Sequence, residues 1–307
     1  MARERSRLSF LGAPSSAGAF CLGQEDAPVA LRRLDLLARL DAVGFEVEDL
    51  GDLPLQRWRP DRDSPRAQNV AAVVANAEAV REQVRRALHG EDAFALVVGG
   101  DCTTGVGTLA GVTAAFAERP NWIYFDLHAD LNTPRNVGSG ALDWMGMAHA
   151  LALPGAVEQL SRLGDGLPLT EPAAVSLFAH DWDRATSWEQ DQLEALALRR
   201  VTCASVAANP VAAADALLRE IDPTRRIVLH FDVDVINFTD APLSENHGRE
   251  TGLLLPAALA ALNTLLADPR VRALTVTELN PHHAAADPAT LPAFVSGLVD
   301  ALAQVGG

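Results

Sequence analysis

Short apolar segments alternate with longer segments of helical periodicity from one end of the chain to the other. The segments of strand length are Leu8–Gly12, Phe45–Leu50, Ala93–Val98, Trp122–Leu127, Ala174–Phe178, Arg200–Cys203, Ile227–Val233 and Leu274–Leu279. Apolar residues at helical spacing fill Val29–Ala42, Asn69–Leu88, Gly105–Glu118, Asp143–Ala152, Trp188–Ala197, Pro210–Ile221, Pro256–Leu266 and Ala289–Gln304. Because strands such as 95–98 are apolar throughout, the pattern predicts a sheet that is buried on both faces.

This alternation predicts the fold class. Strands that alternate with helices along the whole chain indicate an α/β protein, with a central, mostly parallel sheet between two layers of helices. We therefore expect a single α/β/α domain over residues 1–307. In such sheets, ligands bind beyond the carboxyl ends of the strands. The polar residues that follow each apolar segment are therefore the first candidates for chemistry.

Composition narrows the possible partners. The chain has 307 residues and a formal net charge of −15, and it contains no lysine. An acidic surface repels phosphate backbones and anionic lipids, so we expect neither a nucleic acid nor a membrane as partner. Three cysteines without a CxxC pair, and an N-terminal apolar run too short for a signal peptide, predict a cytoplasmic location.

Two strand ends carry acidic residues at alternating positions. Asp126, His128 and Asp130 follow one apolar segment, and Asp232 and Asp234 follow another. Where the backbone is extended, alternate side chains lie on one face, so each set would converge. A single aspartate at such a position more often caps a turn. Two alternating sets instead favour a metal site, because uncompensated burial of so many carboxylates would be costly.

Three segments resemble the signature motifs of the arginase/agmatinase (ureohydrolase) superfamily. They are Gly99-Gly-Asp-Cys102, Asp126-Leu-His-Ala-Asp-Leu-Asn-Thr-Pro134 and Phe231-Asp-Val-Asp234. Weaker matches begin at Phe10, at Gln24 and at Thr277, and all matches stand in the family's order. The resemblance covers almost the whole chain and implies an arginase-like fold.

The resemblance also implies two divalent metal ions, most often Mn²⁺. Asp126 and Asp232 would bridge the ions. Cys102 and Asp130 would complete the ligands of one ion, and His128 and Asp234 those of the other. The family usually has histidine where this chain has Cys102, and a thiolate widens the choice to Zn²⁺, Co²⁺ or Fe²⁺.

The same resemblance implies a small guanidino compound as substrate, for example arginine, Nω-hydroxy-arginine or a related acid. Asp130 would hold and relay a proton, and Glu278 would pair with the guanidinium. The amino-acid end of the substrate would contact four further residues, Asn132, Ser139, Asp181 and Asp183. Many members have a histidine as acid for the leaving amine, and Asp143 stands at that position.

The departures at Cys102 and Asp143 resemble hydroxyarginine-hydrolysing members of the family. A third departure, Asn237 after the second acidic strand, should alter a loop rather than the metal ligands. The resemblance gives no role to His149, His230, His282 or His283, which are interpreted as structural.

The sequence alone is compatible with three functions. The first is a metal-dependent amidinohydrolase, and the second is a catalytically inactive arginase-like scaffold that acts through partners. The third is a deacetylase-type hydrolase with one metal ion, which the two acidic sets disfavour. Arginases are often trimers or hexamers, so a homo-oligomer is compatible with the resemblance.

Overall fold

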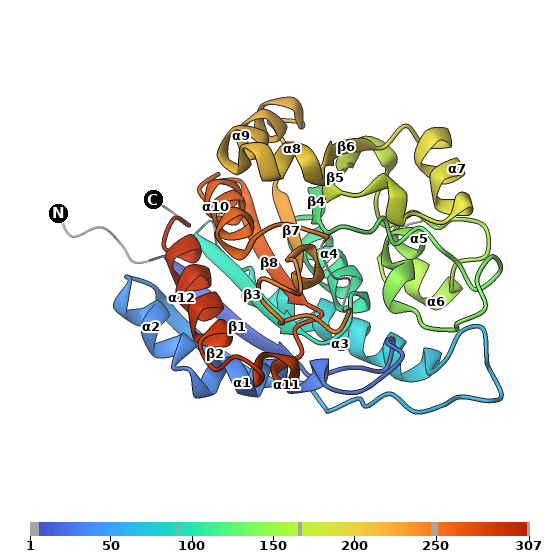
Figure 1. The fold of residues 1–307 in the computed structure, drawn as a ribbon, viewed down its shortest axis with the longest axis horizontal. Coiled ribbons are helices and arrows are strands. Elements are labelled where there is room, and N and C mark those ends of the chain that lie inside the picture. The colour runs from blue at the N-terminus through green and yellow to red at the C-terminus, as the bar shows by residue number, and fades with distance from the viewer. Residues whose placement is uncertain (1–5, 91, 165–167, 247–250, 306–307) are drawn as a thin grey trace.

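One parallel sheet of eight strands forms the centre of the computed structural model, which describes residues 6–90, 92–164, 168–246 and 251–305 (Figure 1). The strand order is β2-β1-β3-β8-β7-β4-β5-β6. The strands are β1 (Arg7–Ala13), β2 (Glu46–Asp52), β3 (Ala93–Gly99), β4 (Asn121–Phe125), β5 (Val175–His180), β6 (Arg199–Thr202), β7 (Ile227–Asp232) and β8 (Val271–Thr277). Because all neighbouring strands run parallel, their carboxyl ends lie at one edge of the sheet.

Helices cover both faces of the sheet. On one face pack α1 (Ala27–Arg33), α2 (Leu36–Ala42), α8 (Cys203–Ala208), α9 (Pro210–Glu220), α10 (Leu255–Leu266), α11 (Pro281–Ala284) and α12 (Thr290–Leu302). On the other pack α3 (Val70–Ala87), α4 (Thr103–Phe116), α5 (Gly146–Ala150), α6 (Glu158–Ser161) and α7 (Ser187–Ala195). The central strands divide their residues between the two cores. In β3, for example, Phe94 and Leu96 face the first core, and Ala95 and Val97 face the second. The predicted three-layer α/β/α fold is confirmed.

All eight predicted strands are present, with ends that shift by a few residues. Three details of the prediction are wrong. The segment Val29–Ala42 forms two helices, because Asp35 adopts a left-handed conformation with φ of 57°. Cys203 begins α8 rather than ending a strand. Strand β4 ends at Phe125 and β7 at Asp232, so the residues beyond them lie in turns. Among the described residues, no helix is both long and apolar enough to span a membrane.

Candidate metal centre

Four strands deliver the predicted metal ligands and Glu278 to one edge of the sheet. Cys102 follows β3 and caps α4, and Asp126 follows β4 directly. Asp232 is the last residue of β7, and Glu278 follows β8. These four strands are neighbours in the order β3-β8-β7-β4, so residues far apart in the sequence meet.

The two acidic motifs form the same local turn. The backbone N–H of His128 donates to Asp126 Oδ1 at 2.7 Å, and that of Asp234 donates to Asp232 Oδ1 at 2.7 Å. In each case a carboxylate at the end of a strand satisfies the amide two residues later and turns the chain. Asp130 has φ of 51°, so alternation along a strand does not place it. The side chains therefore converge through turns, and the predicted extended geometry is wrong beyond Phe125.

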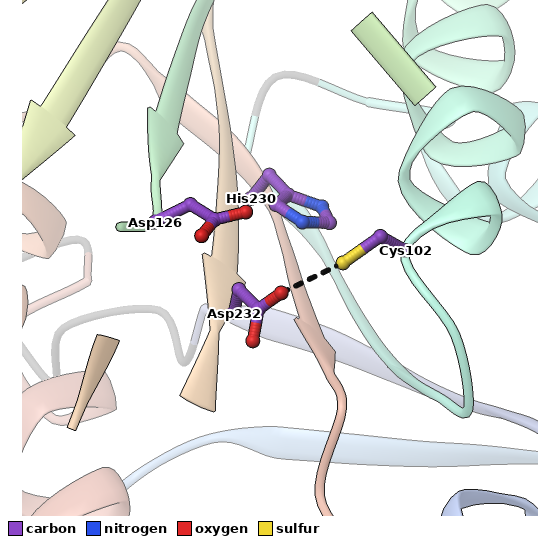
Figure 2. A group of neighbouring side chains, drawn as sticks. All are labelled: Cys102, Asp126, His230 and Asp232. Atoms are coloured by element: carbon purple, nitrogen blue, oxygen red, sulfur yellow. Dashed lines mark hydrogen bonds between the residues drawn. The ribbon is translucent and has the colours of Figure 1, made fainter. Parts of the chain in front are cut away.

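Two groups of side chains are spaced to hold metal ions. Cys102, Asp126, His230 and Asp232 offer ligand atoms that all lie within 4.8 Å of one another (Figure 2). Asp126, His128 and Asp234 form a second group by the same measure. Asp126 belongs to both groups, as a bridging ligand would. Asp130 belongs to neither among the described residues.

The charges in this cluster are unbalanced without cations. Burial and the charge of Asp234 raise the pKa of Asp126 to about 7. Burial and the neighbouring carboxylates raise the pKa of Asp130 and of Asp232 well above the usual range. Burial and Asp232 likewise raise the pKa of the Cys102 thiol. Such groups ionise readily only if positive charge is brought among them.

Buried polar atoms without a hydrogen-bond partner also indicate that cations bind in this cluster. Asp126 Oδ2 and Asp234 Oδ1 are buried and hydrogen bond to none of the described residues. Buried polar atoms nearly always have partners, so each exception needs an explanation. Two divalent cations would supply the missing partners. The donor set of thiolate, imidazole and carboxylates fits borderline ions such as Zn²⁺, Co²⁺ and Fe²⁺ as well as Mn²⁺.

A cavity of about 320 Å³ opens beside the cluster. The residues that line it are Phe20, Cys102, His128, Asp130, Ser139, Ala141, Asp143, Trp144, Asp232, Asp234, Asn246 and Glu278. Burial and the charge of Asp101 raise the pKa of Asp143 to about 8. No arginine lines the cavity among the described residues, so its polar wall is acidic and suits a cation.

Glu278 is held in a fixed orientation at the floor of this cavity. Its Oε1 accepts a hydrogen bond from the backbone N–H of Cys102 at 3.0 Å, and its Oε2 accepts one from Gln24 Nε2 at 2.5 Å. Its backbone has φ of 61° and its N–H donates to the carbonyl of Gly100 at 2.7 Å. A carboxylate locked in this way can orient a planar cation.

Comparison with known proteins places this geometry in a family. The family model described as "Arginase family" matches residues 6–302. The chain belongs to the arginase family.

The following three arginases share between 21% and 34% of their aligned residues with this chain. The arginase of Bacillus subtilis strain 168 is 34% identical over 168 residues, which are 55% of this chain and 55% of that protein, so the match spans about half of each. The arginase of Brevibacillus brevis is 28% identical over 238 residues, 76% of this chain and 78% of that protein. The crystal structure of arginase from Bacillus cereus has the same fold, with a TM-score of 0.84, 21% sequence identity and coverage of 99% of each chain.

The four residues predicted to hold the substrate's amino-acid end are not together in the structure. Ser139 lines the cavity. Asn132 is fully buried, and its Oδ1 accepts hydrogen bonds from Asn136 Nδ2 at 2.8 Å and from Thr186 Oγ1 at 2.9 Å. Asp181 accepts from the backbone N–H of Asp183, and neither residue lines the cavity. Of these four residues of this arginase-family chain, Ser139 is thus the one that lines the cavity.

Two buried aromatic residues at the centre had no predicted role. His230 belongs to the Cys102 group, and its ring stacks on that of Tyr124, with centroids 4.1 Å apart and planes at 6°. Tyr124 Oη donates to Asp130 Oδ2 at 2.5 Å. Gly105 in α4 makes room for the ring, because a Cβ there would lie 2.3 Å from His230 Nδ1. The position of His230 two residues before Asp232 in β7 was a signal in the sequence that its ring lies near this carboxylate.

Proposed function

We propose that this chain is a metal-dependent amidinohydrolase that cleaves a C–N bond of a guanidino substrate with two divalent ions. The observation that carries the proposal is the position of Asp126 in two overlapping ligand groups beside an acidic cavity. Two ions that share one carboxylate lie close enough to act on one water molecule. The family membership over residues 6–302 supports the same chemistry.

Different residues of the chain would bind the two ions and transfer the proton of the attacking water. Cys102, Asp126 and Asp232 would hold one ion, and His128 and Asp234 with Asp126 the other. The sequence resemblance adds Asp130 to the Cys102 side. When bound, the ions supply positive charge that lowers the pKa of a water molecule towards neutrality. Asp130, which lines the cavity, is placed to take up the proton of that water and pass it on.

Substrate recognition would depend on the carboxylates that the ions do not neutralise. Glu278 would accept two N–H groups of the guanidinium, as a carboxylate does with an arginine side chain. Asp143 would donate a proton to the leaving amine, since burial keeps it protonated near neutral pH. The products are then an amine and urea or a urea derivative.

The candidate substrates are arginine, Nω-hydroxy-arginine and related guanidino acids. Ser139, on the cavity wall, would contact the polar end of the substrate, together with Asn132, Asp181 and Asp183 if these rearrange on binding. The thiol at Cys102 supports an N-hydroxylated guanidine. Such a group is less basic than arginine's guanidinium, so weaker activation of water suffices.

A two-step experiment tests the proposal. The purified chain is first loaded with Mn²⁺, Zn²⁺, Co²⁺ or Fe²⁺ and analysed for bound metal after dialysis. Guanidino compounds are then screened with mass detection of urea-type products. Two ions per chain with turnover of a guanidino compound is the expected result. Absence of bound metal under all four conditions would instead support an inactive arginase-like scaffold.

A further inference from the structure

Gln24 contacts the carboxylate of Glu278 from a distant part of the sequence. Its Nε2 donates to Glu278 Oε2 at 2.5 Å, and its side chain is fully buried and does not line the cavity. We propose that Gln24 is a positioning residue that fixes the plane of the Glu278 carboxylate, so that the site selects a planar cation with two parallel N–H groups over an ammonium group. The inference rests on the proposed function in taking Glu278 as the residue that meets the substrate's cation.

Each oxygen of the Glu278 carboxylate is held by one donor. Oε1 accepts from the backbone N–H of Cys102 at 3.0 Å, and Oε2 accepts from Gln24. The Cys102 donor belongs to the backbone at the start of α4 and is fixed there. With that hydrogen bond alone, the carboxylate could still turn about its last side-chain bond, which has a broad torsional preference. The plane of the carboxylate therefore depends on Gln24.

The fixed carboxylate keeps acceptor capacity for a ligand. An ionised carboxylate has about four acceptor positions, and the two donors of the chain use one on each oxygen. A guanidinium or amidinium group presents two parallel N–H groups that match two oxygens in one plane. An ammonium group is a compact charge with three rotatable donors, so it needs no particular plane. Loss of the fixed plane should therefore weaken the binding of the planar cation more than that of the ammonium group.

The orientation of the Gln24 amide is dictated by Glu278. Gln24 Oε1 is buried and has no hydrogen-bond partner among the described residues, which is unfavourable. The reversed amide would place this oxygen against a carboxylate oxygen, acceptor against acceptor. The amide also has no net charge, so it orients Glu278 without cancelling the negative charge that a cation needs. An arginine or lysine in its place would form an ion pair with Glu278 and compete with the substrate.

The turn that carries Gln24 packs directly on the segment that carries Glu278. Gly23 has φ of 133°, and a Cβ there would lie 2.1 Å from Asn280 Nδ2, so this position requires glycine. Glu25 Oε2 accepts the backbone N–H of Gly23 at 2.7 Å and closes the turn. Gln24 therefore reaches Glu278 from a support that is fixed on both sides of the contact.

The test compares two singly charged cations of similar length on the Mn²⁺-loaded protein. Dissociation constants of n-butylguanidinium and n-pentylammonium are measured by calorimetry. Gln24→Met keeps the length of the side chain and removes the N–H donor, and Gln24→Leu is a second variant without a donor. In both, the preference for butylguanidinium over pentylammonium should fall by about tenfold or more, the scale of one hydrogen bond to a charged group. Two ions per chain should remain bound, because Gln24 is in neither ligand group.

Asn76→Leu is the matched control. Asn76 is also a buried amide whose oxygen has no partner among the described residues, and its Nδ2 donates to Thr104 Oγ1 at 3.4 Å, away from the cavity. This variant should keep the wild-type preference. An unchanged preference in Gln24→Met with two ions bound would overturn the inference, and so would an equal fall in Asn76→Leu.

A double-mutant cycle separates positioning from a general effect on structure. If Gln24 acts through Glu278, adding Gln24→Met to Glu278→Gln should cause little further loss of butylguanidinium affinity. Fully additive losses would show that Gln24 acts independently of Glu278 and would overturn the inference.

The outcome is separable from that of the proposed function, because the binding of butylguanidinium requires no turnover. A preference that depends on Gln24 in a protein that hydrolyses no guanidino compound would support this inference and remove the proposed activity. Turnover of a guanidino compound, with a preference that is unchanged in Gln24→Met, would do the reverse.

Discussion

The Cys102 thiol donates a hydrogen bond to Asp232 Oδ2 over 2.9 Å. The two residues stand at the ends of β3 and β7, which are separated in the sheet by β8. A thiol that already points at a carboxylate can exchange its proton for a shared metal ion with little movement of either side chain. This contact makes the region around Cys102 a preformed site.

Asp126→Asn should lose both metal ions, because Asp126 is the residue common to both ligand groups. The amide removes a negative charge from each ion and leaves the remaining carboxylates without a balanced arrangement. Metal analysis after dialysis measures the effect. Asp101→Asn changes a fully buried carboxyl next to Cys102 but outside both groups, and it should keep two ions. Full occupancy in Asp126→Asn would contradict the bridging role.

Glu278→Gln should keep both ions but lower kcat/KM for the guanidino substrate by roughly 10²–10³-fold, the usual scale for losing one charge-stabilising partner in a closed site. The neutral amide cannot pair with a guanidinium. Glu245→Gln, another buried carboxyl that hydrogen bonds to Cys21 and Asn280 outside the cavity, is the control and should change kcat/KM by less than about tenfold. Near-wild-type kinetics in Glu278→Gln would mean that the substrate carries no guanidinium.

Cys102→His should raise activity on arginine relative to Nω-hydroxy-arginine, or shift the pH–rate profile to lower pH. Thiolate donates a full negative charge, whereas imidazole is neutral, so the replacement leaves the ions more effective in lowering the pKa of water. Both proteins are assayed on both substrates across pH at equal metal content. If neither the ratio nor the profile changes, Cys102 does not tune the chemistry.

The pH–rate profile should show a limb that belongs to Asp143. Burial raises its pKa to about 8, so the carboxyl is protonated and able to donate below that pH. The rate should therefore fall as the pH rises above about 8. Asp143→Asn, with metal content checked, should be slower and should lack this limb. A limb that persists unchanged in Asp143→Asn belongs to another group.

His149 should make the fold sensitive to acid. Burial lowers its pKa to about 3, whereas in the unfolded chain a histidine has a pKa of about 6.5. Between these values the unfolded chain binds a proton that the folded chain does not. The contribution of His149 to stability is thus complete above about pH 6.5 and is lost as the pH falls towards 3. Urea unfolding at about pH 7.5 and about pH 5 should show a smaller loss of unfolding free energy in His149→Gln than in the wild type. An equal loss would place the acid sensitivity elsewhere.

Local patterns were enough to predict the layers of the fold. The central strands of this sheet, such as β3 and β4, are apolar on both faces, and helices such as α3 have an apolar side, so hydrophobic periodicity finds both without knowledge of neighbours. The exceptions are local conformations that periodicity does not record. Asp35 breaks the first helical segment in two, and Asp130 leaves the extended conformation, each with a positive φ.

The sequence by itself determined the chemistry of the acidic motifs. Asp126 with His128, and Asp232 with Asp234, interact through turns between residues two apart, so their spacing carries the geometry. Only the tertiary structure decided the surroundings of Cys102. Tyr124 meets His230 because β4 pairs with β7 in one register, and Gln24 meets Glu278 across 254 positions of sequence. Strand order and register depend on the packing of the whole sheet, which no local spacing encodes. That packing is what brings an imidazole from β7 to the thiol at the end of β3.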